Sequence, residues 1–319
     1  MSEMRIAIMG AGGIGAYYGA CLARAGADVV FIARGAHLDA MRNNGLRVQE
    51  FGGADFTVDS VNATDDPAEI GPVDAVLFCV KMYDTIHAAE LCKPLMGNNT
   101  MVVTLQNGVE SVDMINSVLG AEPSTGPAPG LGQALGGAAY ISATIVEPGV
   151  VKRNNQMAKI EFGEPDGTIS RRATAFAKTL KDAGIETAVT PAMQTMLWSK
   201  FVLLTANSGM TSLSGEDTGV VRADPVMRAV YRDAMRESVA VGRAMDVYLP
   251  DDIIERSMDW LDSSAPIKAS LAVDLERGRR LEVEWLSGAV HRLGAQVGVP
   301  TPIHSTVYAA LRPHVNGKA

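Results

Sequence analysis

Residues 4–34, MRIAIMGAGGIGAYYGACLARAGADVVFIAR, decide the fold of the first half of this chain. A short apolar run at residues 4–9 leads into a glycine-rich turn, and an apolar segment through Ala25 follows the turn. A second run, rich in β-branched residues, occupies positions 28–33. The order strand, turn, helix, strand is typical of a parallel sheet with helices on its faces. We therefore predict an α/β fold for this part of the chain.

Later segments extend the same pattern. Near-continuous apolar runs at residues 73–80 and 101–105 predict strands that are buried on both faces. Residues 45–61 hold two alternating stretches around Gly52-Gly53, which predict an inserted hairpin. Residues 122–137, rich in glycine and proline, are predicted to form a mobile loop, either a plain surface connection or a lid. This half is completed by two or three strands at 138–164 with a turn at Pro148-Gly149, an amphipathic helix at 169–183 and a strand at 186–190.

From residue 191 onward the sequence pattern changes. Helical periodicity runs to the end of the chain, and it is interrupted at Leu249-Pro250, Ala265-Pro266 and residues 300–302. A length of 319 residues suits two domains of about 150 residues each. We predict an α/β domain over residues 1–190 and an all-helical C-terminal domain over residues 191–319.

The composition argues against several classes of protein. The formal net charge is -8 and no block of lysine and arginine occurs, which argues against nucleic acid or an anionic membrane as the main partner. No continuous apolar run is long enough for a transmembrane helix and no leader-like segment is visible, so we expect a cytoplasmic protein. The three cysteines form no C-x-x-C pair and the five histidines show no ligand spacing, so we expect buried thiols and no metal site.

The glycine-rich turn matches the pattern G-x-G-x-x-G between a strand and a helix, and it consists of Gly10, Ala11, Gly12, Gly13, Ile14 and Gly15. In this context Gly10 permits a tight turn, Gly12 lets the backbone approach a pyrophosphate, and Gly15 lets the helix pack closely on the strand. Amides and the dipole at the helix N-terminus then face the phosphates. The pattern predicts a Rossmann-type dinucleotide-binding domain; a glycine-rich turn without a ligand is the alternative.

The end of the second strand distinguishes the two nicotinamide dinucleotides. A site for NAD places Asp or Glu there to bond the ribose hydroxyls. This chain has Ala33-Arg34-Gly35, and no carboxylate before Asp39. A guanidinium binds a 2′-phosphate with paired, charge-assisted hydrogen bonds, whereas a carboxylate repels it. Arg34 therefore predicts NADP(H) as the cofactor, with an exposed arginine at a strand end as the alternative.

Polar residues follow two of the predicted strands. Lys81 directly follows the apolar run FCV, and Gln106-Asn107-Gly108 follows the next strand. Ligands bind at the carboxyl ends of the strands in such sheets. Lys81 and Asn107 are therefore candidates for contacts with the nicotinamide half of the cofactor and the substrate. A solvated lysine and a turn asparagine are the alternatives.

Lys200 is a single cation in the otherwise apolar helical run WSKFVLL. Such a lysine either extends its ammonium to solvent or is held partly desolvated, and desolvation lowers the pKa of an ammonium, which suits a proton donor. Asn207 lies two turns further on the same helix face, with Ser208 beside it. By pattern alone, Ser270 and Glu282 do not differ from residues of a solvated helix face.

Together these motifs resemble those of the ketopantoate reductases (2-dehydropantoate 2-reductases). The resemblance covers nearly the whole chain, in order and with fitting spacings. It rests on GAGGIG at 10–15, Ala33-Arg34-Gly35, Val80-Lys81, Leu105-Gln106-Asn107-Gly108, Trp198-Ser199-Lys200 and GRRLEVEWLSG at 278–288. It implies a Rossmann-type domain joined to a helical domain like that of 6-phosphogluconate dehydrogenase, with the site in the cleft between them.

The resemblance also implies roles for individual residues. Lys200 would be the general acid that protonates the C2 carbonyl oxygen as NADPH delivers hydride, and Glu282 would bond the substrate hydroxyl or this lysine. Ser270 would bond the substrate carboxylate. The substrate-binding residues would be Asn107, Asn207, Ser208 and Ser270, and the cofactor-binding residues would be Gly10, Ala11, Gly12, Gly13, Ile14, Gly15, Arg34, Lys81, Asn107 and Glu282.

Two positions depart from the family pattern. Well-known members carry an asparagine one turn after the lysine, where this chain has Leu204, and Ser208 replaces a second asparagine. Asn207 is adjacent and offers its amide from a different angle. A site amide decides which substrate hydroxyl is bonded. We therefore predict ketopantoate as the substrate, with another small oxo or hydroxy acid as the alternative.

A third hypothesis belongs to a different class: an NADP(H)-binding sensor without turnover. A lysine and a glutamate in the site argue against it, because a sensor needs no proton donor. The sequence leaves open whether the protein is a homodimer, in which direction the reaction runs in the cell, and whether residues 120–137 close over the site.

Overall fold

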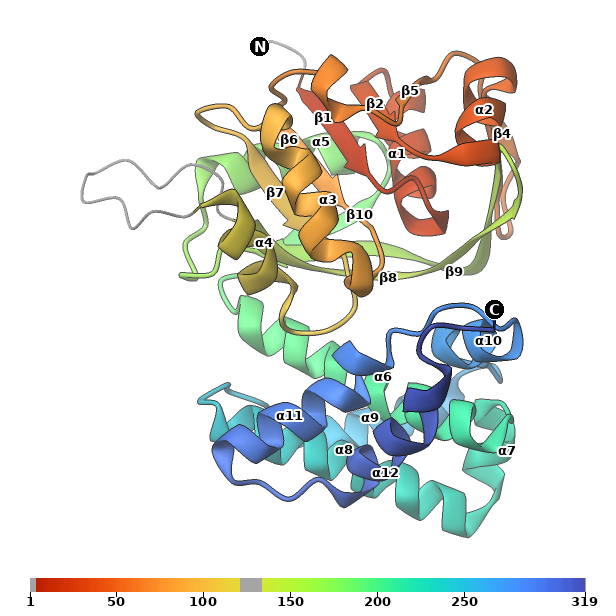
Figure 1. Cartoon of the computed structure of the whole chain (residues 1–319), viewed down its shortest axis with the longest axis vertical. Helices are drawn as coiled ribbons and strands as arrows, with labels where there is room; N and C mark the ends of the chain where they lie inside the picture. The colour runs from red at the N-terminus through yellow and green to blue at the C-terminus, as the bar shows by residue number, and fades with distance from the viewer. Residues whose placement is uncertain (1–3, 121–133, 319) are drawn as a thin grey trace. The chain divides into compact units, whose positions relative to one another are not determined.

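The computed structural model describes residues 4–120 and 134–318. The chain divides into two compact units. Met1–Gln106 and Glu110–Met193 form the first unit, and Asn107–Val109 and Gln194–Ala319 form the second. Figure 1 shows the strands in the first unit and helices alone in the second, as predicted.

In the first unit, ten strands of the described residues form one sheet. Its order is β4-β3-β9-β8-β7-β6-β1-β2-β5, and β10 pairs with β9. The strands from β5 to β8 in this order pair in parallel, which confirms the predicted parallel sheet. The strands are β1 (Arg5–Met9), β2 (Asp28–Ile32), β3 (Leu46–Gln49), β4 (Phe56–Val58), β5 (Asn62–Thr64), β6 (Ala75–Phe78), β7 (Met101–Thr104), β8 (Ala134–Glu147), β9 (Val150–Gly163) and β10 (Glu186–Val189).

The central strands end at one edge of the sheet. Met9 of β1 lies opposite both Ile32 of β2 and Phe78 of β6, and Phe78 lies opposite Thr104 of β7. The chain leaves β1 for β2 on one side and returns to β6 on the other, so the strand order reverses between β1 and β6. In open α/β sheets a ligand binds outside the carboxyl ends of the strands at this reversal.

Helices cover this sheet, and glycine sets how closely the first one approaches. The helices are α1 (Gly13–Arg24), α2 (Gly35–Asn44), α3 (Thr85–Cys92), α4 (Ser111–Leu119) and α5 (Arg171–Asp182). A Cβ at Gly19 of α1 would lie 2.3 Å from the Phe31 ring of β2. Only a residue without a side chain lets α1 pack this closely onto the strand.

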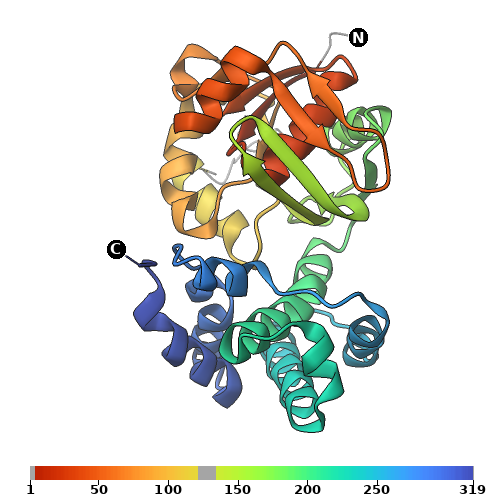
Figure 2. The same cartoon turned by 90° about the vertical axis from the view of Figure 1, so that its right-hand side faces the viewer.

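A long antiparallel ribbon of β8 and β9 extends along α1, as Figure 2 shows. Its predicted turn at Pro148-Gly149 is confirmed, and Gly149 has a φ of 78°. The predicted hairpin at 45–61 is also confirmed: β3 and β4 are antiparallel, and β3 adds to the ribbon beside β9. The ribbon contacts the start of α1, because a Cβ at Gly13 would lie 2.3 Å from the Ala143 carbonyl oxygen.

The predicted loop at residues 122–137 is wrong at its C-terminal end. Ala134 to Gly137 are buried and form the first residues of β8. The glycine at 137 reflects close packing, since a Cβ there would lie 2.8 Å from the Thr104 carbonyl oxygen of β7. Glycine therefore marks a close backbone approach here and not a turn. The rest of the predicted loop, up to residue 133, lies outside the described residues.

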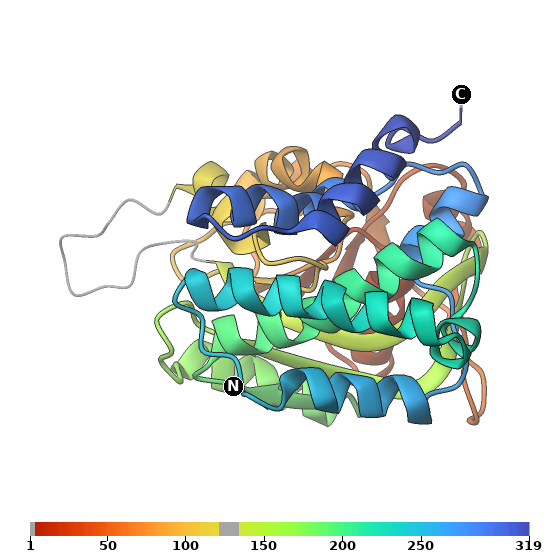
Figure 3. The ribbon, with the colours of Figure 1, turned by 90° about the horizontal axis from the view of Figure 1, so that it is seen from below.

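The second unit consists of helices packed around an apolar core that includes Trp198, Phe201 and Tyr231. Figure 3 shows α8 crossing this unit between α9 on one side and α11 with α12 on the other. Within residues 4–120 and 134–318, no helix combines the length and the apolarity that a membrane crossing requires. The helices are α6 (Met193–Ser214), α7 (Thr218–Ala223), α8 (Pro225–Ala244), α9 (Ile253–Ser263), α10 (Ser270–Glu276), α11 (Ser287–Val297) and α12 (Pro302–Leu311).

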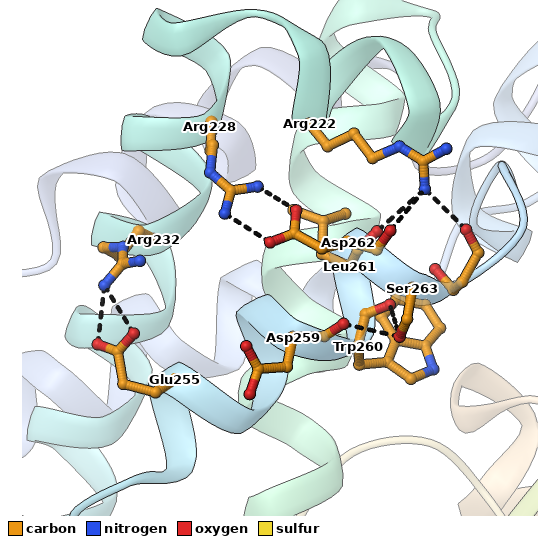
Figure 4. A network of polar contacts seen from close by, with 10 residues as sticks. Arg222, Arg228, Arg232, Glu255, Asp259, Trp260, Leu261, Asp262 and Ser263 are labelled. Atoms are coloured by element: carbon orange, nitrogen blue, oxygen red, sulfur yellow. Dashed lines mark hydrogen bonds and ion pairs between the residues drawn. The ribbon is translucent and has the colours of Figure 1, made fainter.

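Arginines on α7 and α8 attach α9 to this unit, as Figure 4 shows. Arg228 forms a bidentate pair with Asp262, and Arg232 donates to both carboxylate oxygens of Glu255. Arg222 donates to the carbonyl oxygens of Leu261, Asp262 and Ser264, which the end of α9 leaves without helical partners. Each of these arginines is already paired within the fold.

Candidate functional site

The glycine-rich turn has the geometry of a phosphate cradle. Gly10 has a φ of 92°, and a Cβ there would lie 2.7 Å from Val80. A Cβ at Gly15 would lie 2.3 Å from the Gly10 carbonyl oxygen. Gly12 instead faces open space, with no atom within 4 Å of its Cβ position, and it begins α1 without a side-chain cap. The first amides of α1 are therefore open to an anion, and the turn fits a pyrophosphate.

Arg34 lies at the predicted place, directly after β2 and at the start of α2. Its side chain is 76% exposed, and its guanidinium lies 3.4 Å from the Asp84 carboxylate. An ion pair between exposed groups is weak, so Arg34 can exchange this partner for an anionic ligand. Sequence analysis missed Asp84; its position three residues after Lys81, at the edge where β6 ends, was the available signal.

Lys81 and Gln106 follow neighbouring strands of the sheet. Lys81 is half-buried and begins a short 3₁₀ turn, η2 (Met82–Asp84). The buried Gln106 amide donates to Thr85 Oγ1 at 2.7 Å, and Thr85 Oγ1 donates to the Met82 carbonyl oxygen at 2.7 Å. These bonds fix the end of β7 relative to the segment after β6. The predicted cofactor residues of the first unit, residues 10–15, Arg34 and Lys81, thus occupy one edge of the sheet.

In the second unit, Lys200 of α6 donates to Asn107 Oδ1 at 3.1 Å. Asn107 follows Gln106 directly but belongs to this unit, where Val109 packs against the helical core. Glu282 is buried, with 6% of its surface exposed, and it precedes the 3₁₀ turn η4 (Val283–Trp285). The Glu282 carboxylate lies close enough to act electrostatically on Lys200, so Lys200, Asn107 and Glu282 are brought together from positions that are far apart in the sequence.

Burial governs the chemistry of Lys200. Loss of hydration lowers its pKa to about 8, and the nearby Glu282 carboxylate acts in the opposite direction. An ammonium with a pKa close to physiological pH is mostly protonated and still donates its proton readily. The pair of Lys200 and Glu282 therefore has the properties of a general acid and its counter-ion.

The face of α6 beyond Lys200 carries the predicted substrate-binding residues Asn207 and Ser208. It also carries Leu204, the apolar residue that departs from the family pattern. Leu204 is half-buried, whereas Asn207 and Ser208 are buried. Among the described residues, Asn207 Oδ1 and Ser208 Oγ have no hydrogen-bond partner. A buried polar atom without a partner is costly, so these two atoms are candidates to bind a ligand.

Ser270 lies further from Lys200. It is exposed at the start of α10, next to Ala269, whose amide faces Thr211 Oγ1 of α6 at 3.4 Å. Thr211 is eleven residues after Lys200, which corresponds to about 16 Å along the helix axis. The structure does not bring Ser270 to Lys200, and a contact with the substrate carboxylate stays a prediction.

The cysteines and histidines form no second centre in the described residues. No group of three or more metal-ligating side chains occurs there. The cysteines form no disulfide, and burial raises the pKa of Cys21 to about 11 and that of Cys92 to about 12, so both stay protonated thiols. The buried His304 of α12, which sequence analysis did not single out, contacts two further helices of the second unit, α8 and α11.

Two family models of ketopantoate reductase PanE/ApbA match the chain, one over residues 6–167 and its C-terminal counterpart over residues 192–315. A 2-dehydropantoate 2-reductase from Mesorhizobium japonicum is 32% identical, and the match covers 97% of both chains. The solved structure of a PanE/ApbA family ketopantoate reductase from Ralstonia eutropha is also 32% identical, covers 98% of each chain and has a TM-score of 0.87. D-mandelate dehydrogenase in a ternary structure with NADH is 18% identical over 98% of each chain, with a TM-score of 0.85, and so shows the fold alone.

The family matches define an oxidoreductase that acts on a CH–OH/C=O group and uses a nicotinamide dinucleotide. The names of the family and of the relatives, which refer to the reduction of 2-dehydropantoate, support a place in pantothenate biosynthesis. The chain belongs to the ketopantoate reductase family.

Proposed function

We propose that this protein reduces ketopantoate to pantoate with NADPH, and that Lys200 is the general acid. The observation that carries the proposal is the ammonium of Lys200, which is bonded to Asn107, close to Glu282 and lowered in pKa to about 8. A proton donor of this kind has no use in a protein that only binds a dinucleotide, so it favours an enzyme over a sensor.

The proton chemistry follows from these residues. When bound, the dinucleotide supplies hydride to the C2 carbonyl carbon of the substrate. The carbonyl oxygen then gains negative charge, and the Lys200 ammonium transfers a proton to it, so that a hydroxyl forms and the lysine is left neutral. Glu282 favours return of a proton to Lys200 from solvent, because its charge raises the pKa of this lysine.

The buried acceptor on α6 supports a substrate that bears a hydroxyl. Asn207 Oδ1 accepts hydrogen bonds and does not donate them, so a carboxylate cannot satisfy it, whereas the C4 hydroxyl of ketopantoate can. A test compares ketopantoate with 3,3-dimethyl-2-oxobutanoate, which lacks only this hydroxyl. We expect the hydroxyl to raise kcat/KM about 10- to 100-fold, and Asn207→Leu to reduce this preference.

The preference for NADPH rests on Arg34. Its exposed guanidinium suits a 2′-phosphate, but Asp84 neutralises part of its charge. We therefore expect Asp84→Asn to tighten binding of NADPH more than binding of NADH, as measured by fluorescence titration. An equal effect on both dinucleotides would contradict the assignment of Arg34 to the 2′-phosphate.

The decisive experiment follows the absorbance of NADPH, and in parallel NADH, with ketopantoate and the purified protein. Lys200→Ala is expected to lower kcat by ~100-fold or more, whereas Lys178→Ala, which changes an exposed lysine of α5, leaves it unchanged. Tight binding of NADPH without turnover of ketopantoate would favour another small 2-oxo acid, as Leu204 suggests. Full activity of Lys200→Ala would refute its role.

Two further parts of the proposal concern the protein in the cell. We infer that the protein acts in the cytoplasm on a small-molecule 2-oxo acid, without nucleic acid or membrane as partner, and cell fractionation tests this location. A homodimer is a separate prediction, which light scattering of the purified protein tests.

A further inference from the structure

A buried histidine joins three helices of the second unit. His304 of α12 is fully buried, and its Nε2 lies 2.9 Å from the Ala234 carbonyl oxygen of α8. Because a carbonyl oxygen only accepts, Nε2 carries the hydrogen. Nδ1, 3.2 Å from Ser287 Oγ, therefore accepts a hydrogen bond from this hydroxyl at the start of α11. Burial lowers the pKa of His304 to about 4, so the ring is neutral and this arrangement holds at physiological pH.

The same histidine is tied to the helix that carries Lys200. Ser238 Oγ of α8 lies 3.0 Å from His304 Nε2 and 3.0 Å from Thr205 Oγ1, which is five residues after Lys200 on α6. The start of α12 is held as well, because the Glu237 carboxylate accepts from the amides of His304 and its preceding residue at 3.0 and 2.8 Å. The position of α12 is thus fixed relative to α6 and α8.

From this fixed position, the C-terminal part of the chain contacts the Glu282 segment, residues 278–288, on both sides of Glu282. A Cβ at Gly288 would lie 3.0 Å from the ring of Tyr308, so the two parts also pack closely. The hydrogen bonds are Leu281 N–H to the Val315 carbonyl oxygen at 2.9 Å, Tyr308 OH to Glu284 Oε2, Ser287 OH to His304 Nδ1 at 3.2 Å and Lys318 N–H to the Gly278 carbonyl oxygen at 2.9 Å.

We propose that His304 and Tyr308 of α12 are positioning residues, which hold Glu282 beside Lys200 and so keep the general acid protonated during turnover. The proposal rests on the proposed role of Lys200. Their contacts reach the Glu282 segment at Glu284, Ser287 and Gly288, so each acts through this segment. A displacement of Glu282 away from Lys200 would weaken the attraction between the two charges, which is steep at short range.

Two substitutions remove one hydroxyl each from these contacts. Tyr308→Phe keeps the ring that packs on Gly288 and removes the bond to Glu284, and Ser287→Ala removes the donor to His304. We expect kcat to fall about tenfold with KM for both substrates within about twofold, because binding groups stay in place. The limb of the pH profile that falls as Lys200 loses its proton should move to lower pH, since Glu282 then raises the pKa of Lys200 less.

Matched controls separate positioning from general stability. Tyr231→Phe removes another buried tyrosine hydroxyl, one without a partner among the described residues. Thr306→Ala removes a hydroxyl of α12 that donates within the helix itself, to the Pro302 carbonyl oxygen at 2.8 Å. Both controls should leave kcat and the pH profile unchanged. Loss of activity in Tyr308→Phe and Ser287→Ala with an unmoved pH limb would overturn the proposal and indicate a structural role.

A readout without turnover distinguishes failure of this proposal from failure of the proposed function. Lysines labelled with ¹³C at Cε are titrated by NMR, and the Lys200 signal is assigned by its loss in Lys200→Met. We expect its titration midpoint to fall in Tyr308→Phe and Ser287→Ala and to stay in the controls. A lower midpoint in a protein that reduces no 2-oxo acid would support the positioning and refute the proposed reaction; an unchanged midpoint would refute the positioning.

Discussion

Replacing Lys200 by methionine should make the second unit more stable at neutral pH, although it abolishes the proposed acid. Methionine has nearly the shape of lysine without its charge. The pKa of Lys200 falls from an ordinary 10.5 to about 8 because the fold desolvates the ammonium. At ~1.4 kcal/mol for each pKa unit, this difference corresponds to about 3 kcal/mol of destabilisation by the charged form. The gain should stay below that figure, because methionine also loses the bond to Asn107.

The sign of the pH dependence follows from the lowered pKa. Between pH 8 and pH 10.5 the unfolded chain still binds a proton that the folded chain has released, so the stability of the wild-type protein rises with pH in this range. The advantage of Lys200→Met is therefore largest below about pH 8 and disappears above about pH 10.5. Other groups titrate equally in both proteins and cancel in the difference.

The assay is urea unfolding followed by tryptophan fluorescence. All three tryptophans, Trp198, Trp260 and Trp285, lie in the second unit, so the signal reports on the part that contains Lys200. Lys268→Met is the matched control in the same unit: its bond to Glu276 raises the pKa of Lys268, so its loss should give no stabilisation. A Lys200→Met protein that is no more stable than wild type at pH 7, or a difference that does not vary with pH, would refute the reasoning.

Other predictions test the cofactor cradle and the counter-ion. Arg34→Asp should weaken binding of NADPH far more than binding of NADH in a fluorescence titration, because it replaces a cation by an anion at the 2′-phosphate. Gly12→Ala should weaken both dinucleotides about tenfold or more without loss of thermal stability, since its φ is -73° and its Cβ position is open. Gly15→Ala should instead lower the melting temperature, because its Cβ would overlap the Gly10 carbonyl oxygen. Glu282→Gln should move the falling limb of the kcat profile to lower pH by about one unit or more, as expected when a neighbouring opposite charge is lost; an unmoved limb would exclude Glu282 as the counter-ion.

Segments rich in glycine were the hardest feature to interpret from the sequence. In the turn at residues 10–15 they give the geometry of a phosphate cradle, and at Ala134 to Gly137 they mark a strand packed closely against β7. The two cases have similar compositions and differ in what lies opposite the missing Cβ. The turn at residues 10–15 could be predicted because a strand and a helix flank it along the chain. The close packing at residues 134–137 could not, because its partner β7 becomes a neighbour only in the folded protein.

The sequence by itself determined the parallel sheet, the helical second half, the glycine turn and the position of Arg34, because hydrophobic period and turn chemistry depend on neighbours along the chain. Only the tertiary structure decided that Lys200 meets Asn107 and Glu282, that Asp84 faces Arg34, and that His304 joins α12 to the Glu282 segment. These pairs are 17 to 93 residues apart, and their chemistry arises from burial and distance. A lysine in an apolar helix has either an exposed or a desolvated ammonium, and only the packing of the other helices determines which.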